Sequence, residues 1–569
     1  MRQLLLNQLI IILSACVLSS CIAHSSNPSA KLETENKIPI SKLNILVEQE
    51  ISPGVFEYCN LLENFNPKRN ARTAIYLNSI KSVDIPKISK FFKNCYVTKI
   101  GLTKPGNLEK LLPVIAKSFP HVQELTLKQL TKMNWSHLGN FANLKVLKIS
   151  YCKNLSFDKK IYCARIELLE ISDTNIAPQF KLQDLASLYE LRLDNPKHLR
   201  FFPASQVPIL HHLSVSQPRQ KTDLHDKTFL LNILDYKKLN SLELGLIDKF
   251  ADLYPMTKIK SLSVKSNASD VIVDLKKFPN LEIFKCEGHI KSLKNFSAVR
   301  KLKLLSLKGN LVCPDSDFAQ IYKLSNLLIL KIENAVNLKS LSFFKNLSKL
   351  KSISLKNNSS LSDFSEIRWA TELKELKLAT YYDIKKDLKS IFKSNKEIEF
   401  IVLKVGSITN KNLSLEHLSN IKDITLYLNN SKQLEALKNL PKQKLTKMKL
   451  IISDIAPEIT GNFPSLEELT INAICNNAKL ENFVAPKLKS LSLSSFRRVN
   501  NFNFSQLKTY PDLEKINVRN YNISNILDQN YDNLKSLIFP DIKSKVHSSK
   551  ISKRELESAF PKLEYLGRV

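Results

Sequence analysis

Glycine is scarce in this sequence, with only 10 glycines among 569 residues. The sequence contains no G-x-G-x-x-G dinucleotide fingerprint, no G-x-x-x-x-G-K phosphate-binding loop and no G-x-S-x-G nucleophile elbow. These motifs need glycine where the backbone turns sharply or closely approaches a phosphate group. The scarcity therefore argues against the usual nucleotide-binding and α/β-hydrolase sites.

Other signatures of enzymes and membrane-spanning proteins are also missing. No segment after Cys21 approaches the roughly 18 unbroken apolar residues of a membrane-spanning helix. No C-x-x-C pair occurs, which argues against a zinc ribbon or a thioredoxin-like dithiol. The densest histidine group has no carboxylate or cysteine at a recognisable metal-ligand spacing; it comprises His198, His211, His212 and His225. We therefore predict no enzyme activity, no bound metal and no cofactor.

The composition is that of a folded, strongly basic protein, 43% hydrophobic and 24% charged, with a formal net charge of +32. Such a charge suggests nucleic acid or an anionic surface as partner. Lysine accounts for most of the excess, and it lacks the planar fork with which arginine reads bases. A composition rich in lysine, asparagine and isoleucine also follows from an A/T-rich genome. We expect no nucleic-acid partner and favour anionic glycolipid or acidic protein.

The N-terminus carries an export signal over residues 1–20, with Arg2 ahead of an apolar stretch from Leu4 to Val17. Leu18-Ser19-Ser20-Cys21 resembles the bacterial lipobox, which implies that Cys21 becomes the lipid-anchored first residue. The alternative is an ordinary secretory signal. Because Ile22 is not Asp, the resemblance implies the outer membrane in a diderm cell; we expect an extracytoplasmic place at the bacterial envelope. Residues 21–40 are polar with two prolines, which predicts a flexible tether.

Lipidation of Cys21 leaves seven further cysteines in the mature chain, an odd number, so at least one thiol is unpaired. We predict two possible disulfides, one between Cys59 and Cys95 and one between Cys152 and Cys163. The alternative is that these are small buried apolar residues. That alternative is favoured for the remaining cysteines, Cys286, Cys313 and Cys475.

The pattern L-x-x-L-x-L recurs almost to the last residue. Clear examples are Leu144-Leu147-Ile149, Leu188-Leu191-Leu193, Leu302-Leu305-Leu307, Leu350-Ile353-Leu355, Leu373-Leu376-Leu378, Leu466-Leu469-Ile471 and Leu488-Leu491-Leu493. From Val97 to Leu563 the first apolar position recurs at spacings of 20 to 29 residues, which makes 21 units, and a degenerate unit surrounds Ile75 and Leu77. The last two apolar residues alternate with polar ones, as in a strand with one buried face.

This repeat resembles the leucine-rich repeat. The resemblance implies an α/β fold, a right-handed horseshoe-shaped solenoid with a concave parallel β-sheet and a convex side of mixed helical and irregular segments. We expect an N-terminal cap with the degenerate repeat over residues 41–96 and a solenoid of about 21 repeats over residues 97–569. Residues 338–358 look like the 22-residue unit of bacterial internalins.

Strand alternation predicts that the third, fifth and seventh positions of each unit point outward on the concave face. Seven predicted ligand-binding lysines occupy these positions: Lys265, Lys285, Lys308, Lys331, Lys356, Lys377 and Lys404. Earlier units present acids instead: Glu124, Glu170, Glu190, Asp194 and Glu243. The alternative is a solvated surface whose lysines are partly neutralised by Glu287, Glu333 and Glu375.

Together these patterns predict a non-catalytic leucine-rich-repeat lipoprotein at the bacterial cell envelope. Its concave face would bind a protein or an anionic glycolipid, and the lipid on Cys21 would bind the membrane. Two alternatives remain: a structural envelope scaffold that associates with itself or its neighbours, and a hydrolase with an unrecognised site.

Overall fold

A computed structural model gives the fold of the chain. The structure describes residues 45–52, 55–59, 72–130, 135–152, 165–174, 185–194, 207–216, 235–245, 253, 255–266, 271–380, 388–404, 415–428, 431–453, 459–473, 480, 482–495, 500–503, 507, 509–519, 521–524, 533–539, 560–563 and 565–568. The predicted signal peptide and tether, with Cys21, lie outside these residues.

One 25-stranded sheet runs through the whole molecule, and 22 of its strands are parallel and follow one another in chain order. These are β3 (Arg72–Asn78), β4 (Tyr96–Thr103), β5 (Glu124–Lys128), β6 (Val146–Ser150), β7 (Leu168–Ser172), β8 (Glu190–Asp194), β9 (His212–Ser216), β10 (Ser241–Leu244), β11 (Ser261–Lys265), β13 (Ile283–Lys294), β14 (Leu304–Leu311), β15 (Ile329–Glu333), β16 (Ser352–Lys356), β17 (Glu375–Ala379), β18 (Phe400–Lys404), β19 (Asp423–Leu428), β20 (Lys447–Ile452), β22 (Glu468–Ala473), β24 (Ser490–Ser495), β26 (Lys515–Arg519), β28 (Ser536–Phe539) and β29 (Tyr565–Arg568).

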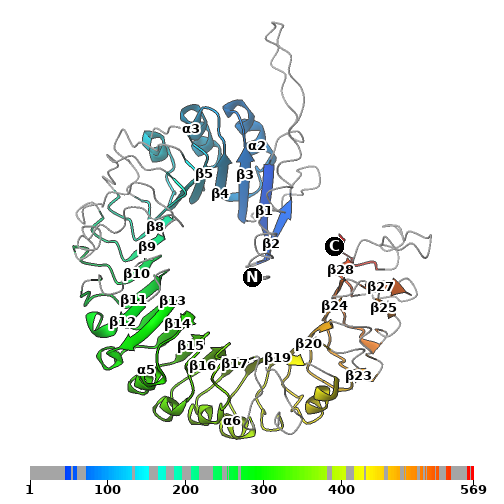
Figure 1. Ribbon diagram of the computed structural model, residues 1–569. Helices are drawn as coiled ribbons and strands as arrows, with labels where there is room; N and C mark the ends of the chain where they lie inside the picture. Colours follow the sequence, from blue (N-terminus) through cyan, green and yellow to red (C-terminus); the bar gives the residue numbers. More distant parts are fainter. Residues whose placement is uncertain are drawn as a thin grey trace.

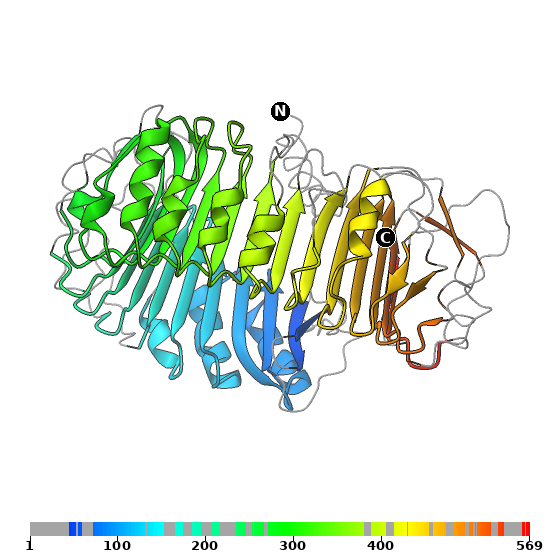
Figure 2. The same ribbon diagram turned by 90° about the horizontal axis from the view of Figure 1, so that it is seen from below.

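Figure 1 shows this sheet lining the inner side of a nearly closed horseshoe. The helices lie on the outer side: α2 (Ile85–Phe91), α3 (Leu108–Ser118), α5 (Asp315–Ala319) and α6 (Lys389–Ser394). Figure 2 shows successive coils stacked side by side with their strands aligned. The predicted solenoid with a concave parallel sheet is therefore confirmed, and every predicted L-x-x-L-x-L unit contributes one strand.

Short elements complete the outer side. The 3-10 helices are η3 (Ser82–Asp84), η4 (Trp135–Asn140), η7 (Leu275–Lys277), η8 (Phe296–Ala298), η9 (Gln320–Lys323), η10 (Ser342–Asn346), η11 (Ser365–Trp369) and η12 (Ser431–Leu437). Strand β12 (Val271–Asp274) pairs with the second half of β13, and two small sheets pair β21 (Gly461–Asn462) with β23 (Phe483–Val484) and β25 (Asn500–Asn503) with β27 (Tyr521–Ser524). The convex side is thus mixed in its secondary structure, as predicted.

An antiparallel hairpin covers the N-terminal edge of the sheet. Strands β1 (Ile45–Ser52) and β2 (Val55–Cys59) pair with each other, and β1 also pairs antiparallel with β3, the degenerate first repeat. The hairpin therefore supplies hydrogen bonds to a strand that no preceding coil would satisfy.

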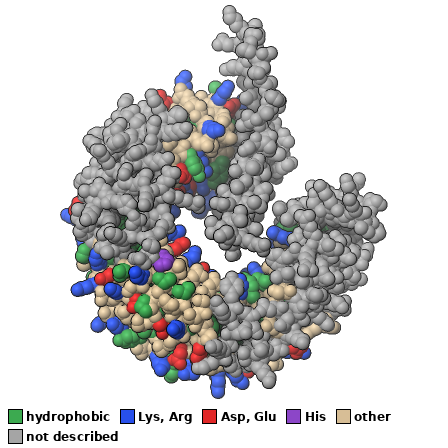
Figure 3. Space-filling view, in the orientation of Figure 1, with side chains coloured by type: hydrophobic (Ala, Val, Ile, Leu, Met, Phe, Trp, Pro, Cys, Tyr) green, Lys and Arg blue, Asp and Glu red, His purple; other side chains and the backbone are tan. Residues whose placement is uncertain are grey.

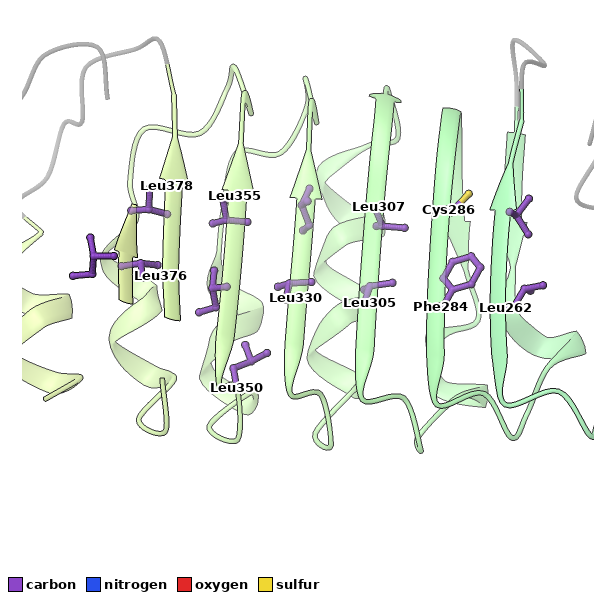
Figure 4. Close-up of a cluster of buried hydrophobic side chains, with 14 of the residues drawn as sticks. Leu262, Phe284, Cys286, Leu305, Leu307, Leu330, Leu350, Leu355, Leu376 and Leu378 are labelled. Atoms are coloured by element: carbon purple, nitrogen blue, oxygen red, sulfur yellow. The ribbon is translucent and has the colours of Figure 1, made fainter. Parts of the chain in front are cut away.

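The core is a continuous stack of the apolar repeat positions. Figure 4 shows side chains of adjacent coils pointing to the same side of the sheet, among them Leu305, Leu307, Leu330 and Leu355. These side chains are at most 1% exposed. Each coil rests on its neighbours alone, so stability is a sum of neighbouring interfaces along the solenoid.

The eighth position of the repeat turns the chain out of the strand. In several coils the residue at this position takes a left-handed backbone, for example Gln129 (φ 59°), Tyr151 (φ 57°) and Asn357 (φ 52°). The amide of each donates to the seventh-position carbonyl of the next coil, as from Gln129 to Ser150 over 3.0 Å. This conformation is uncommon for residues with a Cβ, so the turn stores strain that the ladder of hydrogen bonds offsets.

The rim where the chain enters each strand is tied by polar ladders. At the second repeat position, Lys303 Nζ lies 2.7 Å from Glu282 Oε2, and Lys422 Nζ lies 2.7 Å from Glu399 Oε2. We call these groups, with Lys260 and Lys374 on their other flanks, the rim ladder. Just before the first position, asparagine amides donate to the preceding coil, as from Asn280 Nδ2 to the Thr257 carbonyl over 2.8 Å.

Candidate recognition surface

The seven predicted lysines all lie on the concave side of consecutive strands from β11 to β18, and all are partly or fully exposed. Register separates them into two rows across the strands. The seven lysines therefore do not form a single line, because neighbouring coils place them alternately at the fifth and the seventh position. Each row has its own chemistry.

The fifth positions form what we call the Ser/Lys row. Cross-strand pairing aligns its members in the order Ser263, Lys285, Ser306, Lys331, Ser354, Lys377. A serine thus separates each pair of lysines, and lysines of alternate coils stand about 9.6 Å apart at two strand spacings. This spacing reduces the repulsion that lysines on adjacent strands would feel. Lys285 and Lys331 are exposed, and Lys377 is half-exposed.

The seventh positions form a second row, the Lys/Glu row, in which lysines and acids alternate. Lys265, Glu287 and Lys308 are directly opposite one another on β11, β13 and β14. The Glu287 carboxylate forms ion pairs with both lysines: its Oε2 lies 3.5 Å from Lys265 Nζ, and its Oε1 lies 3.9 Å from Lys308 Nζ. Further along the sheet Glu333 lies opposite Lys356. The partial neutralisation expected of a solvated surface is thus present at Glu287.

Two of the remaining lysines also have partners. Lys377 forms an ion pair with Glu375 on the same strand. Burial alone would raise the pKa of Glu375, but hydrogen bonds from Lys377 and Ser352 outweigh it and hold the pKa below its ordinary value. Lys404 places its Nζ 5.4 Å from the ring centroid of Tyr427 on the next strand. In the part of the chain that the structure describes, Lys285, Lys331 and Lys356 have no ion-pair partner within 4 Å.

The third positions beside the Ser/Lys row are apolar over three strands. Ile283, Leu304 and Ile329 lie directly opposite one another on β13, β14 and β15, partly exposed on the concave side. We call them the apolar row. In the same line on β18, Phe400 is 43% exposed, with Val402 two residues further along the strand. The apolar row therefore lies directly beside the lysines of the Ser/Lys row.

Sequence reasoning overlooked this apolar row. The signal was present, since these residues occupy the third position of their repeats, which the pattern already placed outside. The lysines and acids alone were considered at these outward positions. Composition alone does not distinguish a half-exposed isoleucine from a buried one, because only register decides which face it occupies.

Acidic residues on the concave face of the earlier coils form ion pairs with neighbouring lysines. Glu124 Oε1 lies 3.3 Å from Lys99 Nζ and 3.0 Å from Lys148 Nζ. Desolvation would lower the pKa of Lys99, but hydrogen bonding to Tyr76 and the charge of Glu124 raise it above its ordinary value. The expected change of sign along the face is thus reduced at its N-terminal end.

A serine, a histidine and a carboxylate meet on β8, β9 and β10. His212 Nδ1 lies 2.7 Å from Ser241 Oγ, and His212 Nε2 lies 3.7 Å from Glu190 Oε1. Glu190 Oε1 instead pairs with Arg192 Nε at 2.6 Å. The distance from Glu190 Oε1 to His212 Nε2 is too long for a hydrogen bond. Ser241 lies within a flat strand, and its own amide donates to the His211 carbonyl. The arrangement therefore lacks a carboxylate-oriented base, and no amide of Ser241 remains to stabilise an oxyanion.

The structure describes two of the four histidines of the group, His211 and His212. His211 Nδ1 contacts the Ile209 carbonyl at 2.6 Å and its ring stacks on Tyr189, while His198 and His225 lie outside the described residues. Over the described ranges, no group of three or more histidine, cysteine or acidic side chains is placed to hold a metal. Over the same ranges, no helix is long and apolar enough to cross a membrane.

The Cys59 and Cys95 pairing is wrong. Strand order places β1 and β3 between β2, which ends at Cys59, and β4, which Cys95 precedes. Three strand spacings amount to about 14 Å, whereas the Cα atoms of a disulfide lie within roughly 7 Å.

Cys152 is a buried free thiol at the ninth repeat position. Its sulfur accepts from the Leu130 amide and donates to the Ser150 carbonyl, both at 3.4 Å. It therefore satisfies backbone groups of the turn, a task that Asn358 performs in a later coil. Cys163, its predicted partner, lies outside the described residues. Cys286 and Cys313 are buried, as expected.

Comparisons with known proteins bear on the fold alone. No protein-family model matches the chain, and no curated protein sequence matches it. Among solved structures, a leucine-rich-repeat protein of Leptospira interrogans is 16% identical over 81% of this chain and 98% of its own, with a TM-score of 0.38. An internalin of Listeria monocytogenes is 16% identical over 64% and 88%, with a TM-score of 0.34. A plant peptide hormone receptor, RGFR1, solved in complex with RGF2, is 13% identical over 88% and 78%, with a TM-score of 0.33.

Proposed function

We propose that this leucine-rich-repeat protein binds a macromolecular partner non-covalently through its concave face, and that the partner is a protein. The observation that carries the proposal is the pair of unpaired lysines, Lys285 and Lys331, beside the apolar row on a continuous parallel sheet. An exposed sheet that serves only solubility gains nothing from a partly exposed apolar row. The plant receptor solved with RGF2 is an example of this fold with a bound partner.

We further propose that the chain is a lipoprotein displayed at the bacterial cell envelope, with its lipid on Cys21. The lipobox-like Leu18-Ser19-Ser20-Cys21 after an apolar stretch supports this proposal. The polar tether then lets the solenoid stand away from the membrane. Replacing Cys21 with Ser should block processing or release the protein from membranes. Unchanged partitioning of the Cys21→Ser protein into the detergent phase would contradict the anchor.

Capture from envelope extracts tests the binding function. The immobilised full chain should retain a foreign protein, and Lys285→Glu with Lys331→Glu should release it. A matched control reverses two convex lysines, Lys345 and Lys349, and should retain the partner. Retention of only its own chain would favour the structural scaffold. Equal retention by the Lys285/Lys331 variant and the convex variant would contradict recognition through these two lysines, and indifference of capture to every concave substitution would contradict recognition by the concave face.

A further inference from the structure

We propose that the concave face of β13 to β18 binds an acidic amphipathic helix of the partner, which lies across the strands. Its acidic residues would contact the Ser/Lys row and its apolar residues the apolar row. The inference rests on the proposed function and specifies which partner chemistry the same face recognises.

Lys265 and Lys308 share the single carboxylate of Glu287, and Lys377 contacts Glu375, so each of these lysines already has an acidic partner. Among the described residues, three exposed lysines of the seven have no ion pair: Lys285 and Lys331 in the Ser/Lys row, and Lys356 in the Lys/Glu row, opposite Glu333. An incoming carboxylate can therefore pair with Lys285 and Lys331 without displacing an existing ion pair.

The spacing of these lysines matches a helix. Lys285 and Lys331 lie two strands apart, about 9.6 Å. On a helix, residues i and i+7 lie about 10.5 Å apart along the axis and on the same face. Ser306 lies between the two lysines, and its small side chain leaves room for the helix to approach. A helix that crosses the strands can thus pair one acid with each lysine.

The apolar row makes the proposed partner amphipathic. It lies two residues along the strands from the Ser/Lys row, about 6.6 Å away, and a helix about 10 Å in diameter spans both rows. The Lys/Glu row on the opposite flank is internally paired and offers no comparable apolar contact. On β18, Phe400 lies in the line of the apolar row and Val402 in the line of the Ser/Lys row, and the exposed aromatic ring is suited to anchor a partner side chain.

The inner side of these strands is open to such a partner. In Figure 1, β13 to β17 face the central opening of the horseshoe, with α5 and α6 on the opposite side of the sheet. Figure 3 shows basic and acidic side chains interspersed over this part of the molecule. Because the charges are mixed, the position of each carboxylate on the partner should matter more than its total charge.

Three probes test the inference against the full chain by fluorescence anisotropy. The first is a synthetic helical peptide of 18 residues with glutamates at i and i+7 beside a leucine face. The second has the same composition with the glutamates scrambled into the leucine face, and the third is heparin, a polyanion without an apolar face. We expect the amphipathic peptide to bind at least tenfold more tightly than the scrambled one. Its affinity should fall steeply between 0.05 and 0.3 M salt, because salt screens the ion pairs.

Variants assign the binding to the two rows. The double variant Lys285→Glu with Lys331→Glu should lower the affinity for the amphipathic peptide at least tenfold. The double variant Ile283→Ser with Ile329→Ser should lower this affinity without changing its salt dependence. Lys345→Glu with Lys349→Glu on the convex side is the charge-matched control and should have no effect. If the serine variant does not fold, the lysine variant still decides the question.

Three outcomes would overturn the inference: equal binding of ordered and scrambled peptides, heparin binding as tightly as the amphipathic peptide, or indifference to the lysine reversals. The proposed function fails separately. It falls only if no concave substitution affects capture of the partner from envelope extracts, whereas capture that depends on concave residues outside these rows would leave it standing and overturn the helix.

Discussion

Gly288 and Gly309 lie directly opposite each other on β13 and β14, and a Cβ added to Gly309 would overlap the carbonyl oxygen of Gly288. Both glycines have positive φ, 155° and 113°. At this eighth position the coils of Gln129 and Asn357 turn outward with a left-handed backbone, but here the strands continue, to Lys294 in β13 and Leu311 in β14. The two glycines therefore permit a close backbone approach and a longer pairing in the middle of the solenoid.

Gly309→Ala should destabilise the protein by about 1–3 kcal/mol, because the new Cβ forces the paired strands apart in a strained conformation. Gly106→Ala is the control, since nothing lies within 4 Å of a Cβ there, and it should change stability by less than about 0.5 kcal/mol. Urea unfolding followed by circular dichroism measures both. Identical midpoints for the two variants would contradict the close approach.

Leu305→Ala should cost about 2–5 kcal/mol, because it leaves a cavity between coils. Leu305 is 0% exposed, and its neighbour Ser306 points to the concave side. Ser306→Ala should therefore change stability little. Equal losses for the two variants would mean that the strand register is shifted by one residue.

The buried thiols should resist alkylation. Burial raises the pKa of Cys286 and of Cys313 to about 12, and the carboxylates of Glu287 and Asp317 add to the effect at the respective thiol. The reactive thiolate is then nearly absent at neutral pH. Iodoacetamide followed by mass spectrometry should find both cysteines unmodified in buffer and modified in urea. Rapid labelling in buffer would contradict their place in the core.

Acid should weaken the rim ladder. A hydrogen bond from Lys303 is the main cause that lowers the pKa of Glu282, and Lys422 does the same for Glu399. A carboxyl whose pKa is depressed on folding stabilises the native state above its unfolded pKa of about 4.3, and loses this contribution as the pH falls toward the folded value.

Glu282→Gln should therefore reduce the fall in unfolding midpoint between pH 6 and pH 3. Glu397→Gln makes the same charge change at an exposed glutamate with no ion pair among the described residues, and should follow the wild type. The contribution of the rim ladder to stability is small, since the carboxylates of Glu282 and Glu399 lie near the surface. Superimposable pH profiles for the wild type and Glu282→Gln would show that the ladder contributes nothing.

Much of the fold could be predicted from one pattern. The alternation in Leu302-Leu305-Leu307 fixes which side of β14 is buried, and the recurrence of the pattern places the strands side by side. The turn at the eighth position was not predictable, because Gln129, Tyr151 and Asn357 share the same backbone without sharing a side-chain type. There the hydrogen bonds of the neighbouring coil select the conformation, and no local propensity indicates it.

The candidate surface was predicted less completely. Alternation placed Lys285 and Lys308 on the concave side correctly, but their separation into two rows depends on comparing positions across strands. Ion pairing between Lys308 and Glu287 likewise depends on a partner 21 residues away in the chain, on the neighbouring strand. The failed pairing of Cys59 with Cys95 has the same origin, since proximity in the sequence does not reveal strand order.

The central claim is that Lys285 and Lys331 are covered by a partner where the protein works. Limited lysine acetylation, quantified by mass spectrometry, compares the protein in intact envelopes of its source cells with the purified full chain. We predict that Lys285 and Lys331 are acetylated several-fold less in envelopes and recover after a high-salt wash, while the convex Lys345 and Lys349 react equally in both samples. Equal acetylation of all four lysines in envelopes and in the purified protein would contradict recognition by the concave face.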